Sequence, residues 1–360
     1  MNKKLIALAV AGVTLAPAVM AQTANPVTLY GRIYVSYNTA NARGSAVPGG
    51  VATPNITRRG IVVDESSLIG FRGTEDLGGG LKAFFQLESS APPDAGGGTF
   101  GSRNSAVGLQ GAFGSIMLGI WDTPMKVTAL IIDPTGQLSL TDPQGIISNA
   151  ADGKAGQVFN RRQANTVQYW SPNINGFSGR IMYSPNEAKT ATANPTLLSL
   201  NATYAGGPIA AGYAYEVHKD QLNNTVTAGS TEKAHMVTGS FKFGAFKVGA
   251  LAQRITRTAK TNQRVYLVTG QYDIGKHTFW VDYGRSKDGL ASGAVQPLAK
   301  LAGIGYYYNF SKRTTFVADY ASIVNNYVSQ YSFNGTGART FVAGPGNDPK
   351  GFGMGLRHLF

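Results

Sequence analysis

Apolar and polar residues alternate along most of this chain with a period of two. In the segment 29–36, Leu29, Ile33 and Val35 share one face, and polar or aromatic residues take the other. The segment 81–88 repeats the pattern, with apolar residues at its odd positions and Lys82, Gln86 and Glu88 at even ones. Because side chains of a β-strand point alternately to opposite faces, this pattern predicts strands with one apolar face.

About sixteen such segments can be counted along the sequence, and they predict an all-β protein. They are 28–38, 61–74, 81–90, 103–111, 115–121, 163–170, 178–184, 197–205, 209–217, 234–243, 247–257, 262–272, 277–286, 299–309, 314–324 and 351–360. Their connections alternate between short turns, such as 112–114 and 206–208, and long loops, such as 122–162. An even number of hairpin strands with turns at one end and loops at the other is typical of an outer-membrane β-barrel.

A soluble β-sandwich or propeller is the alternative fold, because alternation alone does not distinguish a protein core from lipid. The length of the segments favours the barrel, since about 9–11 residues cross a membrane as a tilted strand. A closed barrel also pairs every strand edge, as hydrocarbon requires. After the N-terminus, no run of 18 apolar residues predicts a membrane-spanning helix.

The N-terminus predicts export. Lys3 and Lys4 precede an apolar run from Leu5 to Val19, and small residues surround a cleavage position after Ala21. These features are typical of a secretory signal peptide. The alternative, a single spanning helix, is disfavoured by the short run and by Pro17. We therefore expect a signal peptide over 1–21 and a single mature barrel domain over 22–360.

The composition narrows the function. Charged residues make up only 14% of the chain, and its net charge is +13, or 32 − 2 − 19 = +11 once the two signal-peptide lysines are removed. The absence of Cys excludes disulfides, thiolate metal sites and Cys nucleophiles. The four His residues show no metal-ligand spacing, and there is no Gly-x-Ser-x-Gly nucleophile motif. We expect no enzyme activity, no cofactor, no metal and no nucleic-acid binding.

Four stretches resemble the Gram-negative general porins, in particular their betaproteobacterial branch. They are Val27-Thr28-Leu29-Tyr30-Gly31, the run from Gly70 to Glu88 (GFRGTEDLGGGLKAFFQLE), Ser171-Pro172-Asn173 with Gly176-Phe177-Ser178-Gly179, and the terminal Gly355-Leu356-Arg357-His358-Leu359-Phe360. The resemblance covers nearly the whole mature chain. It implies a sixteen-stranded, antiparallel, trimeric channel whose third long loop folds into the lumen. It also implies that Phe360 belongs to the signal read by the barrel-assembly machinery.

The loop 122–162 is the longest, at about 40 residues against the usual 2–5 for a hairpin connection. The resemblance places it inside the barrel as a constriction. Asp122, Asp133 and Asp142 are our candidates for its acidic face. The alternative is an external lid or a trimer contact.

Opposite this loop the resemblance implies a ladder of wall arginines, and Arg162 matches one of them. Two other expected positions hold Leu68 and Ile120-Trp121 instead. Arg32 and Arg72 fall on the lumen-facing parity, and Lys82 and Arg161 are weaker candidates. The alternative for each is a solvated side chain neutralised by an acid.

Fixed positive charge in a pore attracts anions. At 4 Å two unit charges interact by about 1 kcal/mol in water and about 4 at an effective dielectric of 20. We expect an anion-preferring channel for ions and small hydrophilic solutes, in contact with outer-membrane lipid including lipopolysaccharide. The alternatives are a substrate-specific anion channel on the same barrel, and an adhesin or receptor barrel with little conductance.

Overall fold

The computed structural model describes residues 27–46, 48, 52–148, 158–185, 187–222, 224–258, 260–288, 295–333 and 344–360. The predicted signal peptide over 1–21 lies outside these residues, as does part of the loop 122–162.

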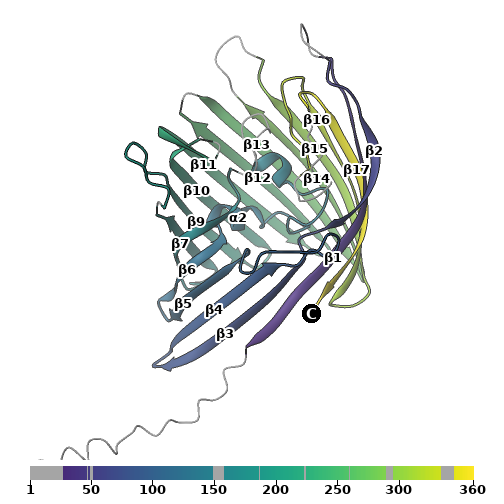
Figure 1. Cartoon of the computed structure of the whole chain (residues 1–360). Helices are drawn as coiled ribbons and strands as arrows, with labels where there is room; N and C mark the ends of the chain where they lie inside the picture. Colours follow the sequence, from purple (N-terminus) through teal and green to yellow (C-terminus); the bar gives the residue numbers. More distant parts are fainter. Residues whose placement is uncertain are drawn as a thin grey trace, which may run out of the picture.

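The described chain forms one antiparallel sheet that closes on itself, because β17 pairs with β1 (Figure 1). The strands are β1 (Thr28–Arg43), β2 (Ile56–Asp64), β3 (Leu68–Gly78), β4 (Leu81–Ser90), β5 (Ser105–Gly111), β6 (Gly114–Asp122), β7 (Arg162–Trp170), β8 (Phe177–Ser184), β9 (Thr196–Gly206), β10 (Ile209–Leu222), β11 (Thr225–Phe243), β12 (Phe246–Arg257), β13 (Lys260–Ile274), β14 (His277–Asp288), β15 (Leu298–Asn309), β16 (Thr314–Asn325) and β17 (Asp348–Leu359). β2 and β3 both pair with β1, one above the other, and together fill one position in the wall. The barrel therefore has sixteen strand positions, and the predicted fold class is confirmed.

The segment 61–74 differs from the prediction, because it is not one continuous strand. Between the pairs Val35↔Asp64 and Arg32↔Leu68, two residues of β1 face three residues of the neighbouring strand. Such an extra residue is a β-bulge, which bends a strand and re-aims its side chains. Ser66 takes a φ of 66° there, and the side chain of Ser67 accepts a hydrogen bond from the Tyr34 amide at 2.9 Å. The backbone groups freed by the break are thereby satisfied.

The two faces of the wall match the predicted alternation. Val237, Val268 and Leu356 point outward, and more than half of each side chain is exposed (58%, 53% and 52%). Their neighbours in sequence face the lumen, as in β12, where exposed and buried residues alternate from Val248 to Arg257. An apolar band around the outside is what lipid requires of a barrel.

The long connection from β6 to β7 packs against lumen-facing side chains of the wall. Its helix α2 (Pro124–Ala129) contacts β8 to β11, and its helix α3 (Gln144–Ile147) contacts β14 and β15. Between the two helices, hydrogen bonds attach it to β13 and β14, from Thr269 Oγ1 to the Ile132 carbonyl (2.7 Å) and from Trp280 Nε1 to Thr141 Oγ1 (3.1 Å). Within the described part of the chain, no helix is long and apolar enough to cross a membrane.

Lumen-facing glycines leave room for this connection. A Cβ on Gly249 of β12 would lie 2.8 Å from Ile132 Cβ, and one on Gly284 of β14 would lie 2.3 Å from Ile146 Cδ1. At Gly249 the neighbouring atom is a Cβ, so glycine is needed for the approach, whereas at Gly284 the end of the Ile146 side chain would have to shift. Ile132 and Ile146 are fully buried there and join a cluster with Leu251, Val265 and other apolar residues of the wall. Apolar residues on the inner face of β11 to β16 are thus covered by the connection rather than by water.

Candidate functional site: the basic wall of the lumen

Six arginines face the lumen along the arc of the wall that runs from β17 through β1 and β3 to β8. We call this set the basic wall. It consists of Arg32 (β1), Arg72 (β3), Arg103 (before β5), Arg162 (β7), Arg180 (β8) and Arg357 (β17). Sequence reasoning identified Arg32, Arg72 and Arg162, and it missed the other three.

Arg162 begins β7 and lies directly across from Asp122, the last residue of β6. Its guanidinium reaches Asp122 Oδ1 at 3.2 Å and donates to Asn104 Oδ1 at 2.7 Å. Lys126 Nζ lies 3.0 Å from the same carboxylate oxygen. One carboxylate therefore holds two cations, and a surplus of positive charge remains at this point of the wall.

Arg103 extends the basic wall from Arg162 toward Arg32. Burial, and next the charge of Arg162, lower the pKa of Arg103, although Glu88 partly offsets this. Its nearest acid contact is long, with Nε 3.9 Å from Glu88 Oε2. The predicted segment 103–111 begins at Arg103, whereas β5 begins at Ser105 and leaves Arg103 in the β4–β5 connection, and alternation did not identify it as a wall residue.

Arg32 owes its position to the bulge between β2 and β3. Its guanidinium donates a hydrogen bond of 2.7 Å to the Ser66 carbonyl, at the residue with positive φ. A carbonyl anchors the side chain without cancelling its charge. Arg32 also interacts electrostatically with Arg103 and Arg357, so like charges face one another here.

The remaining arginines of the basic wall lie against aromatic rings. The Cζ atoms of Arg72, Arg180 and Arg357 lie 5.0, 4.1 and 5.1 Å from the ring centroids of Tyr30, Trp170 and Tyr307 respectively. Such cation–π contacts orient a guanidinium while leaving its charge in place. Arg180 and Arg357 lie on the lumen-facing parity of their strands, which is the signal that could have found them.

Lys82 and Arg161, the weaker candidates, are not brought into this set. Lys82 is exposed and lies opposite Asp76, one residue from the short β3–β4 turn. Arg161 precedes β7 and hydrogen-bonds to the side chain of Asn224. Burial lowers the pKa of Arg161, against the favourable charges of Glu216 and Glu232.

The three candidate loop acids lie in different places. Asp122 lies beside Arg162 on the wall rather than across the lumen from it. Asp133 is buried and accepts hydrogen bonds from the Thr135 amide and hydroxyl and from the Gln137 amide, at 2.7–2.8 Å. Asp142 is buried and accepts from the Gln144 amide at 2.9 Å. Burial raises the pKa of Asp133. Asp133 and Asp142 thus shape the connection's own backbone.

Phe360 lies at the seam of the barrel. Its amide donates to the Gly31 carbonyl (3.1 Å), and its carbonyl accepts from the Gly31 amide (3.0 Å). Its ring lies over Gly31, where a Cβ would come within 2.3 Å of it. The last residue therefore completes the pairing of the first and last strands.

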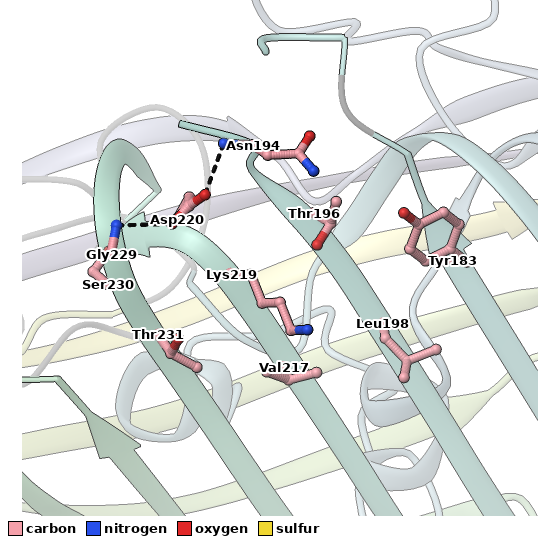
Figure 2. Close-up of a pocket in the computed structure, with 10 residues that line it drawn as sticks. All are labelled: Tyr183, Asn194, Thr196, Leu198, Val217, Lys219, Asp220, Gly229, Ser230 and Thr231. Carbon is pink, nitrogen blue, oxygen red and sulfur yellow. Dashed lines mark hydrogen bonds between the residues drawn. The ribbon is translucent and has the colours of Figure 1, made fainter. Parts of the chain in front are cut away.

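A groove of about 450 Å³ lies on the outward face of β8 to β11, near the loop ends of these strands (Figure 2). Its lining combines Leu198 and Val217 with the ammonium group of Lys219. Asp220 fixes its upper rim by accepting hydrogen bonds from the amides of Asn194 (2.7 Å) and Gly229 (2.8 Å). The groove thus combines apolar side chains with one cation, Lys219, and one carboxylate, Asp220, whose oxygens accept from backbone amides.

Comparison with known proteins agrees with the barrel fold. A model of the Gram-negative porin family matches residues 7–327. The chain is 30% identical over 374 residues to outer membrane porin protein 32 of Delftia acidovorans, and 30% identical over 367 residues to major outer membrane protein P.IB of Neisseria meningitidis serogroup B. Each match covers 100% of both chains. Among solved structures, an anion-selective porin from Comamonas acidovorans matches with a TM-score of 0.79 and 25% identity, covering 93% of this chain and 100% of that one.

Proposed function

This chain belongs to the Gram-negative porin family, and from that premise we propose that its basic wall makes it an anion-preferring channel. As a porin it is a passive channel of the outer membrane and not an enzyme. The preference for anions is the further step. It is supported by the anion selectivity named for the similar Comamonas porin.

One observation carries this proposal: cations outnumber carboxylates along the basic wall. Asp122 is shared by Arg162 and Lys126, and Arg32 is anchored by a carbonyl. Asp133 and Asp142 hold backbone amides of the β6–β7 connection. A row of fixed positive charges raises the local concentration of anions and lowers that of cations.

We also propose that the connection 122–162 is the constriction of this channel. Its contacts with lumen-facing residues of β8 to β15 support this role, because a segment bound there occupies part of the cross-section. The two sides of the constriction are then the basic wall and the surface of the connection. Asp122 belongs to the basic wall.

Three partners complete the proposal. Family membership supports a homotrimer. The position of Phe360 at the seam supports its recognition by the barrel-assembly machinery. The groove beside Lys219 supports contact with the phosphorylated, acylated lipid of the outer leaflet, lipopolysaccharide. The signal peptide over 1–21 stays a prediction.

The test is the current through purified protein in a planar bilayer under a KCl gradient. We expect conductance steps in groups of three and a reversal potential that favours chloride. A potential that favours potassium would overturn the anion preference and leave the porin. Correctly folded oligomers without conductance would instead favour the adhesin or receptor alternative.

A further inference from the structure

Two of the three tryptophans of this protein lie together on the lumen side of the wall. The rings of Trp121 (β6) and Trp170 (β7) meet edge to face, with centroids 5.4 Å apart and planes at 75°. Both side chains are half-buried. The backbone of the two strands is irregular near the two rings. Gly119 of β6 and Asn165 of β7 both have positive φ, at 153° and 57°.

Arg180 completes the cluster from β8. It pairs with Trp170 in the sheet, and its guanidinium carbon lies 4.1 Å from the centroid of that ring. Among the residues that the structure describes, no carboxylate lies within 4 Å of Arg180, and no side-chain hydrogen bond is formed by it. The acid whose charge it feels is Asp122, which already holds Arg162 and Lys126. Arg180 thus offers an oriented, uncompensated charge.

Indole rings with part of their surface exposed are an unusual lining for an aqueous channel. Apolar aromatic surface next to a few convergent polar groups is the usual composition of a binding site for an organic ligand. The rings provide faces and edges for a second planar ring, and the guanidinium provides paired N–H donors that match a carboxylate. An inorganic anion would use only the charge, and a neutral arene only the rings.

We propose that Trp121, Trp170 and Arg180 form a binding site for planar aromatic carboxylates inside the channel. The site recognises the carboxylate through Arg180 and the ring through the two tryptophans. Solutes of this class then enter and pass more effectively at low concentration than other organic anions of equal size. This inference rests on the proposed anion-preferring channel, whose lumen must be open to solutes.

Intrinsic fluorescence tests the site directly, since the third tryptophan, Trp280, is 1% exposed and lies beneath Thr141. The probe is benzoate, titrated into purified, folded oligomers that are excited at the red edge of tryptophan absorption. The comparison ligands are cyclohexanecarboxylate, which has the charge without the planar ring, and benzyl alcohol, which has the ring without the charge. We expect saturable quenching by benzoate, with the other two binding at least five- to tenfold more weakly.

Variants assign the binding to the named residues. Arg180→Met should weaken benzoate binding by about tenfold or more, because a charge-assisted hydrogen bond is lost. Trp121→Leu should weaken benzoate and leave cyclohexanecarboxylate nearly unchanged, and it serves also if Arg180→Met fails to assemble. Arg264→Met is the matched control, because Arg264 is exposed on the outward face of β13. Equal affinity for benzoate and cyclohexanecarboxylate, or unchanged binding in both site variants, would overturn the inference.

The same samples are measured in KCl in the planar bilayer. Chloride-favouring conductance without benzoate binding removes the aromatic site and leaves the proposed function intact. Benzoate binding to the wild type should also reduce the chloride current in a concentration-dependent way, and this reduction should be absent in Arg180→Met. Loss of chloride preference in the wild type is the separate result that removes the proposed function.

Discussion

At the scale of the residue, the ion pair between Arg162 and Asp122 contributes directly to the charge of the lumen. They face each other across neighbouring strands, and Lys126 contacts the same oxygen of the Asp122 carboxylate as Arg162 does. Each residue therefore affects the lumen charge both directly and through its partners. Opposite substitutions at these positions should shift selectivity in opposite directions.

Replacing Arg162 with Glu should weaken the chloride preference several-fold, because it removes one cation and adds an acid beside Asp122. The reversal potential in a KCl gradient measures the change. Arg264→Glu, on the outward face of β13, is the control and should leave the potential unchanged. An unchanged potential in Arg162→Glu would take Arg162 out of the selectivity region.

Replacing Asp122 with Asn should strengthen the chloride preference, because Arg162 and Lys126 then lose their common counterion. The measurement is again the reversal potential in a KCl gradient. A shift toward potassium would show that the carboxylate does not shield these two cations.

Sequence parity identified Arg32 and Arg72, but not the whole basic wall, although Arg180 and Arg357 have the same lumen-facing parity. Arg32 and Arg72 alternate with apolar neighbours, and so does Arg357. Arg103 lies outside any strand, so only the folded chain brings it beside Arg162. The location of Asp122 depends on the register of β6 with β7, which alternation along one strand does not specify.

At the scale of the element, the connection between β6 and β7 is held by close packing as well as by hydrogen bonds. Two of its isoleucines lie against glycines of the wall, and helix α2 is capped by Thr123 Oγ1, which accepts from the Lys126 amide at 3.3 Å. Adding bulk at a wall glycine should therefore dislodge the connection without touching any charge.

We expect Gly249→Val to increase single-channel conductance, because its Cβ would overlap Ile132 Cβ and detach the connection beyond α2. Overpacking of this kind costs about 1–3 kcal/mol, enough to change how a loop docks. Gly239→Val is the control, since a Cβ there meets only the Ala210 carbonyl oxygen at 3.8 Å. Equal conductance in the two variants would contradict the role of the connection as the constriction.

The strands in the membrane were predicted closely, and the errors follow from where alternation stops. β4 has the predicted bounds, whereas β11 begins at Thr225, nine residues before the predicted start. Residues 225–233 are mostly polar, so this extension of the hairpin has no apolar face to detect. The division between β2 and β3 was not predicted for a different reason. A bulge inserts one residue into a strand without changing its composition.

At the scale of the whole molecule, closure depends on the two ends of the chain. β1 pairs with β17 from Arg32↔Leu359 to Arg43↔Asp348, and Phe360 adds two backbone hydrogen bonds to Gly31. This pairing removes the last free strand edges, which a membrane does not tolerate.

Replacing Phe360 with Ala should lower the amount of folded oligomer in the outer membrane, whereas Phe360→Tyr should largely preserve it. The ring is needed both over Gly31 and, in our proposal, for recognition by the assembly machinery. Heat-modifiable migration on a denaturing gel measures the folded fraction. Equal yields of the Ala and Tyr variants would show that the terminal ring is dispensable.

The same seam bears on the order in which the molecule assembles. Leu140 of the β6–β7 connection is buried in one cluster with Ala40 and Ala42 of β1, and it would contact a Cβ placed on Gly351 of β17 at 3.4 Å. The connection thus lies against the inside of the joint between the first and last strands. Once that joint forms, the wall is complete and the connection has no lateral way in. After closure the connection can enter only along the barrel axis, and its packing against Ala40, Ala42 and Gly351 then stabilises the joint itself.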